Sequence, residues 1–196
     1  MAKDHKMSVD NSGENSGVLV GTNNGTINYQ LQNNTKIPSM ITEIVKTLGN
    51  IYVDNENESS SFVAFEIDDK IQHNSIIKYR EIIRAYAIYF YQCENAMDLY
   101  DNSNIDSKAR ILHCVKIWYL EFKGDLLLLF KDSHQTEIEL VRDNADLLIE
   151  NIYQKIKEAI VGSSNNTSMN IEDVDLGVIC FVCYCFMKCK ILEKPL

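Results

Sequence analysis

The chain has 196 residues, of which 45% are hydrophobic and 24% are charged, and its formal net charge is −9 at pH 7. This length suits one compact domain with a tail, and a core of this size needs neither a metal ion nor a disulfide in order to fold. The acidic charge argues against direct binding to nucleic acid, because contact with the phosphate backbone requires clustered Lys and Arg.

The sequence gives no signal for export or for membrane insertion. The first 15 residues are polar, whereas a secretory signal peptide has an apolar central region. The longest apolar run, Val178–Met187, has ten residues and is too short to cross a bilayer. We therefore expect a cytoplasmic protein that does not bind a membrane, with its six cysteines present as thiols.

Residues 1–36 are predicted to form a flexible or β-prone arm, and residues 37–196 a helical domain. Asn and Gly dominate the arm, and both residue types favour turns and left-handed backbone. The run Val18–Ile27 resembles the core of RHIM-type amyloid signalling motifs, although Leu19 replaces the Gln of that pattern. Two interpretations stay open: an arm that tethers or adds a strand to a partner, and an adaptor that assembles through amyloid. In both, the contact residues are Val18, Val20, Gly21, Asn23, Asn24 and Ile27.

The domain carries apolar residues at steps of three and four, which predicts helices. We expect an all-α helical bundle with one short helix from Pro38 to Gly49. In chain order, the four long helices are expected at Ser75–Tyr100, Asp106–Phe130, Thr136–Val161 and Ile171–Leu192. Asp106 is a plausible N-cap and Gly49 a left-handed C-cap. The short apolar run Phe62–Ile67 fits either a strand or the start of a helix.

The last helix is apolar on nearly all sides, unlike the others. Such a helix lies at the centre of a fold or in an interface with another chain. Both roles remain open at this stage. If the helix is an interface, the side chains that we expect to contact a partner are Val178, Phe181, Val182 and Phe186.

No catalytic, cofactor or metal site is predicted. The four C-terminal cysteines lie on one helix and cannot converge on a single ion, so we expect them to be small buried hydrophobic residues. Asp68 and Lys70 match the second half of a metal-dependent nuclease motif, which stays an alternative function. That motif also needs an upstream Asp beside it, and only Asp54 has the required spacing. The cysteines are Cys180, Cys183, Cys185 and Cys189.

The domain resembles a helical domain of the bacterial ABC-three-component defence systems, the group that includes Lamassu. The resemblance covers residues 62–195 as scattered matches, of which the closing run Cys189–Glu193 is the most specific. It implies an accessory subunit of an anti-phage complex that binds an SMC-like ATPase or an effector and has no activity of its own. Association with further copies of the chain stays open. The other matching residues are Ile67, Lys70, Ile71, His73, Asn74, Tyr79, Ile83, Tyr86, Tyr119, Leu120 and Glu121.

Overall fold

The computed structural model describes residues 36–50 and 61–195, with backbone only for residues 61–66. This part of the chain consists of helices and contains no strand, which confirms the all-α prediction. The helices are α1 Met40–Gly49, α2 Ser61–His73, α3 Arg80–Tyr86, the 3₁₀ turn η1 Ala87–Tyr89, α4 Phe90–Ser103, α5 Ser107–Leu129, α6 Glu137–Asp143, α7 Ala145–Val161 and α8 Ile171–Met187. No helix among these residues is both long enough and apolar enough to span a bilayer.

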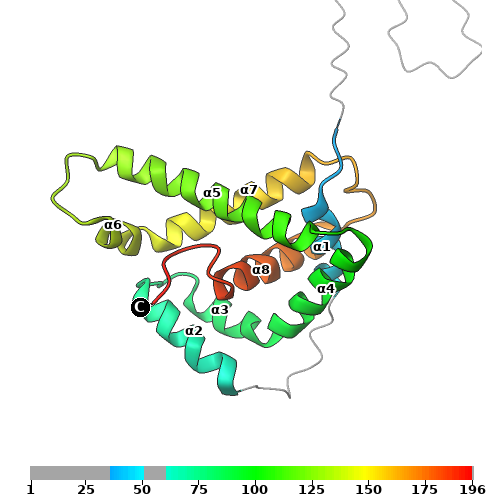
Figure 1. Cartoon of the computed structure of the whole chain (residues 1–196), viewed down its shortest axis with the longest axis horizontal. Helices are drawn as coiled ribbons and strands as arrows, with labels where there is room; N and C mark the ends of the chain where they lie inside the picture. Colours follow the sequence, from blue (N-terminus) through cyan, green and yellow to red (C-terminus); the bar gives the residue numbers. More distant parts are fainter. Residues whose placement is uncertain (1–35, 51–60, 196) are drawn as a thin grey trace, which may run out of the picture. The chain divides into compact units, whose positions relative to one another are not determined.

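Helix α8 lies at the centre of the bundle (Figure 1). It packs most extensively against α1 and also contacts α3, η1, α4 and α7. Its last eight residues, Cys180–Met187, are all buried. The apolar character of α8 on all sides therefore has a simple cause, because other helices of the same chain cover it.

Two glycines allow α1 and α8 to approach each other closely. A Cβ atom on Gly177 would lie 2.3 Å from the carbonyl oxygen of Val45, and one on Gly49 would lie 2.3 Å from that of Asp173. Real Cβ atoms do not come this close to backbone, so neither position accepts a side chain. The expectation that Gly49 is a left-handed cap was wrong, since no described glycine has a positive φ.

The expected helix Ser75–Tyr100 is interrupted. The chain turns after α2, with Ser75 in the left-handed region at φ 55°, and then forms α3, η1 and α4 in succession. Asp146 on α7 fixes this turn, because its carboxylate accepts the backbone N–H groups of Ile77, Lys78 and Tyr79 at 2.9 to 3.1 Å. The helix therefore begins at Arg80 and not at Ser75, and η1 interrupts it further on. Apolar spacing alone does not reveal a turn that depends on a residue almost 70 positions away.

The expected helix Thr136–Val161 is also divided, into α6 and α7. Its start is as predicted, because Thr136 and Glu139 form a reciprocal capping box. At Asn144 the helical hydrogen bonding is interrupted, and the Asn144 side chain donates to the carbonyl oxygen of Leu140 at 2.9 Å. Asn competes for backbone hydrogen bonds in this way, which makes it a weak residue inside a helix.

Other helix ends differ by a few residues from the prediction. Helix α1 begins at Met40 and not at Pro38, and Phe62–Ile67 belongs to α2. Asp106 makes no side-chain cap; Asp101 instead accepts the backbone N–H of Lys108 at 2.9 Å. Helix α8 ends at Met187, and the chain continues as a turn in which Cys189 and Leu192 have left-handed backbone.

Candidate functional site

The contact residues predicted in the arm, Val18, Val20, Gly21, Asn23, Asn24 and Ile27, lie outside the described residues. The four predicted on α8 are in the core: Val178 and Phe181 are 0% exposed, and Val182 and Phe186 are 2% exposed. Of the two roles that the sequence left open for α8, the structure shows a helix at the centre of the fold. A partner could reach these side chains only if α8 separated from α1 and α7.

The buried cysteines form part of the packing. Cys180, Cys183 and Cys185 are buried on α8, and Cys180 Sγ lies 3.2 Å from Cys93 Sγ of α4. Among the described residues, no group of three or more His, Cys, Asp or Glu side chains is arranged to hold a metal ion. The sulfur atoms therefore act here as small apolar groups.

We expect iodoacetamide to alkylate Cys114 and Cys189 in the native protein, because both are only partly buried. Alkylation requires a thiolate. Burial raises the pKa of the Cys183 and Cys185 thiols, and the hydrogen bond to Cys180 together with burial raises that of Cys93. Burial also raises the pKa of Cys114, which is expected to react because it stays partly accessible. Peptide mass mapping before and after addition of urea shows which cysteines react in the native protein and which react only after unfolding. Early modification of Cys183 in the native protein would show that α8 leaves the core.

The nuclease-like residues are engaged in structural contacts. Lys70 Nζ donates to the carbonyl oxygen of Met187 at the end of α8, at 2.5 Å, where a cation offsets the negative end of the helix dipole. Asp68 pairs with Arg84 at 2.9 Å. The upstream Asp54 lies outside the described residues.

A buried asparagine holds the segment that follows α8. Asn74 is 0% exposed; its Nδ2 donates to the carbonyl oxygen of Glu193, and its Oδ1 accepts the Glu193 backbone N–H, both at 2.9 Å. The Glu193 carboxylate accepts from Tyr119 Oη at 2.7 Å and from Lys123 Nζ at 2.6 Å. Asn74 directly after α2, two residues of α5 and Glu193 of the closing segment thus form one cluster. Three of its four members were singled out in the sequence, and Lys123 was missed because no local pattern marks a long-range ion pair.

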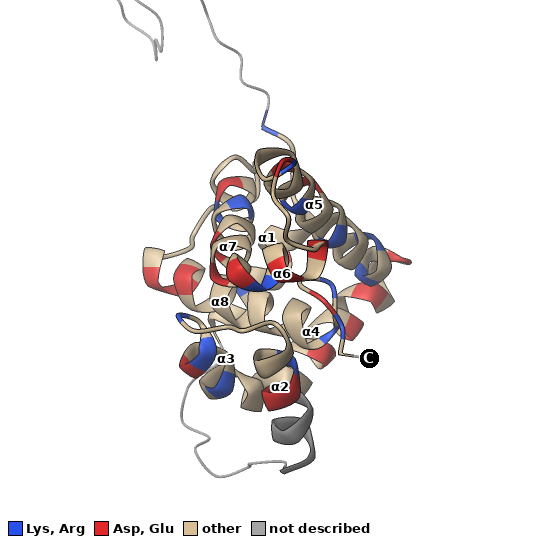
Figure 2. Cartoon of the chain, turned by 90° about the vertical axis from the view of Figure 1, so that its left-hand side faces the viewer, with Lys and Arg blue, Asp and Glu red and all other residues tan. Residues whose placement is uncertain are grey.

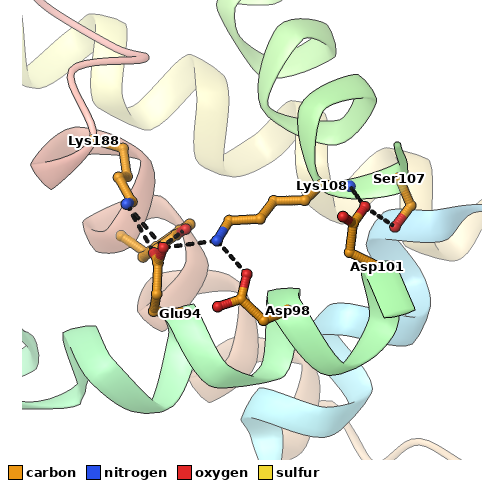
Figure 3. A network of polar contacts seen from close by, with 7 residues as sticks. Glu94, Asp98, Asp101, Ser107, Lys108 and Lys188 are labelled. Atoms are coloured by element: carbon orange, nitrogen blue, oxygen red, sulfur yellow. Dashed lines mark hydrogen bonds and ion pairs between the residues drawn. The ribbon is translucent and has the colours of Figure 1, made fainter. Parts of the chain in front are cut away.

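A second polar cluster joins α4, α5 and α8 around Glu94 (Figure 3). Glu94 accepts from Tyr184 Oη at 2.6 Å, from Lys108 Nζ at 2.7 Å and from Lys188 Nζ at 3.0 Å. Partial burial alone would raise the pKa of Glu94, but these three hydrogen bonds outweigh it and lower the pKa to about 2. The cluster ties the end of α8 to α4 and α5.

The Glu94 cluster predicts a dependence of stability on pH. The folded pKa of about 2 lies below the ordinary value of 4.5, so the ionised carboxylate stabilises the fold above pH 4.5. This stabilisation is lost as the pH falls from 4.5 towards 2. Glu94→Gln should lower the free energy of unfolding by about 1 to 2 kcal/mol at pH 7, and by less at low pH. Urea denaturation of the unmodified protein and of Glu94→Gln at several pH values measures the difference in their free energies of unfolding. The control is Glu121→Gln, at an exposed position. If both variants lose the same free energy of unfolding, the prediction is contradicted.

Helix α5 carries exposed apolar side chains on its outer face. Ile117, Leu120 and Leu128 are 42%, 50% and 71% exposed, and their spacing places them on one face, opposite the buried side chains of Val115, Tyr119 and Leu126. We call these three residues with Gly124 the α5 stripe. A Cβ on Gly124 would meet nothing within 4 Å. In Figure 1, α5 runs along the outside of the bundle with α7 on its inner side.

Charges do not form a basic patch on the face shown in Figure 2, where Lys and Arg alternate with Asp and Glu over most helices.

We compared the chain with protein-family models, with curated proteins and with solved structures, and it matches none of them.

Proposed function

We propose that this protein is an accessory or adaptor subunit, without catalytic activity, of a bacterial anti-phage defence complex. It binds an SMC-like ATPase or an effector subunit through the α5 stripe. The observation that carries the proposal is that α5 is apolar on two opposite faces, of which the described residues cover only one. Apolar side chains aligned on an outer helix face are typical of protein-binding surfaces.

The arrangement of the residues that carry the resemblance supports the same proposal. Lys70, Asn74 and Tyr119 are far from the C-terminal segment in the sequence, yet Asn74 and Tyr119 bind Glu193, and Lys70 binds Met187 at the end of α8. In this proposal these contacts keep the helices around α8 fixed relative to one another, so that the outer face of α5 is held in place for a partner. A partner then binds a preformed surface and does not have to order it.

The proposal is tested by isolating the tagged protein from its native host and identifying the proteins that remain bound. We expect an SMC-like ATPase or its effector to co-purify with the unmodified chain. Ile117→Glu and Leu128→Glu should each weaken that association by at least about 30-fold, because a charge then has to be buried at the centre of the interface. Circular dichroism verifies that the variants remain folded.

A matched control is Ile171→Glu, which introduces the same change at a side chain that is 75% exposed, outside the α5 stripe. Association that survives in the control and is lost in the stripe variants supports the proposal. The proposal fails if no SMC-like ATPase or effector is bound, or if all three variants bind it as well as the unmodified chain does.

A further inference from the structure

A hollow of about 380 Å³ opens between α3, α7 and α8. This volume is in the range of small-molecule sites. The three helices lie along one side of the bundle in Figure 2. Three aromatic rings, three aliphatic side chains and one carboxylate form the wall: Tyr79, Tyr86, Tyr153, Ile82, Leu176, Ile179 and Asp175.

The carboxylate in this hollow is held in place by its neighbours. Asp175 Oδ1 accepts from Tyr153 Oη at 3.1 Å and from Lys157 Nζ at 2.6 Å. No hydrogen bond from a described residue reaches the second oxygen, Oδ2. A carboxylate fixed through one oxygen can accept a hydrogen bond, or face a positive charge, with the other.

Two of the three rings already face a cation of the chain. Lys78 Nζ lies 5.0 Å from the centre of the Tyr79 ring, and Lys157 Nζ lies 5.4 Å from that of Tyr153. Both distances are within the range of cation–π attraction. Among the described residues, no Lys or Arg lies over the ring of Tyr86, and no hydrogen bond involves its hydroxyl group. The Tyr86 ring also contacts the ring of Tyr89, with the two ring centres 5.7 Å apart. Because Tyr86 lines the hollow as well, its ring can meet a cation from outside the chain there.

The charges around the hollow leave an excess of negative charge. Lys78 is paired with Glu150 at 2.5 Å and Lys157 with Asp175 at 2.6 Å. Asp146 is next to Tyr79 and binds only the backbone N–H groups of the turn. Three carboxylates against two ammonium groups leave one negative charge, which favours a cation over an anion or a neutral molecule.

We propose that this hollow binds a small organic ammonium ion. Its charged head lies over Tyr86 beside Asp175, and its alkyl part packs on Ile82, Leu176 and Ile179. The inference is independent of the α5 stripe, since α5 contributes no residue to the hollow.

The test is an NMR titration of the full chain with choline and, in parallel, with 3,3-dimethylbutan-1-ol, its uncharged carbon analogue. Both molecules have nearly the same shape, so a difference in affinity reports the charge. We expect saturable shifts of the amide signals of residues 175–179 and of Tyr86, with choline binding about tenfold more tightly than the alcohol. Equal affinities, or the absence of saturable shifts in these residues, would overturn the proposal.

Two substitutions locate the cation. Tyr86→Leu keeps an apolar side chain but removes the ring, and Asp175→Asn keeps the shape but removes the charge. Each should weaken choline binding by about fivefold or more and change binding of the alcohol little. Tyr91→Leu is the control, because Tyr91 is a 57% exposed tyrosine that does not line the hollow. If both variants bind choline as tightly as the unmodified chain does, choline does not bind in this hollow and the proposal is wrong.

Discussion

Gly177→Ala is expected to lower the free energy of unfolding by about 3 kcal/mol, the upper part of the range for overpacking a core. Ala is a better helix former than Gly and on its own would stabilise α8. Here the added Cβ would lie 2.3 Å from the carbonyl oxygen of Val45, so α1 and α8 would have to separate. That separation would also disturb the contacts of α8 with its other neighbours. Urea denaturation followed by circular dichroism gives the value.

The same substitution at Gly124 is the matched control. Gly124 is also inside a helix, but a Cβ there would meet nothing within 4 Å. We expect Gly124→Ala to raise the free energy of unfolding by about 0.5 to 1 kcal/mol, as helix propensity alone predicts. If both variants are stabilised alike, the close approach of α1 to α8 is not as tight as described.

Asn74→Ala should have a similarly large effect and lower the free energy of unfolding by about 3 kcal/mol. Removal of this side chain leaves the backbone N–H and C=O of Glu193 without their partner in a partly buried place, and each such group costs about 1 to 3 kcal/mol when water does not reach it. The segment after α8 would then loosen. Hydrogen exchange at the Glu193 amide, compared with amides in the middle of α7, measures this local effect.

Asn104→Ala serves as the control for Asn74→Ala. Both side chains donate to the carbonyl oxygen four residues earlier, Asn74 at 2.9 Å and Asn104 at 3.2 Å. Asn104 is exposed, and no long-range hydrogen bond of its side chain is described. We expect Asn104→Ala to change stability by no more than about 0.5 kcal/mol. A small effect in both variants would mean that Asn74 does not anchor the closing segment.

The helical class and the content of the core could be predicted from the sequence because apolar spacing is a local property. Ile111, Val115, Ile152 and Ile156 were expected on apolar faces, and all are buried. The start of α3 at Arg80, the 3₁₀ turn Ala87–Tyr89 and the break at Asn144 could not be predicted, since Asp146 and the packing of neighbouring helices decide them. Apolar spacing also cannot tell a buried face from an exposed one. For that reason the α5 stripe was not predicted, and both a central and an interface role stayed open for α8.

The hollow between α3, α7 and α8 had no counterpart in the sequence interpretation. Tyr79 and Tyr86 were noted for other reasons, and Tyr153 and Asp175 lie on two other helices. Such a site depends on the angle between helices, which no local pattern encodes. The spacing between Tyr153 and Lys157 does place both on one face of α7, but it gives no hint that Asp175 lies opposite them.

The pairing of α1 with α8 has a consequence for how the chain folds. These two helices are the first and the last described helices in the sequence, yet they pack against each other more extensively than any other pair. During synthesis the part of α1 that packs on α8 therefore stays uncovered until the residues of α8 have emerged. Contacts between such distant segments carry a large loop-closure cost and slow the folding of a domain. Among helical proteins, this chain should consequently fold slowly, and its incomplete forms should be prone to aggregate before α8 is in place.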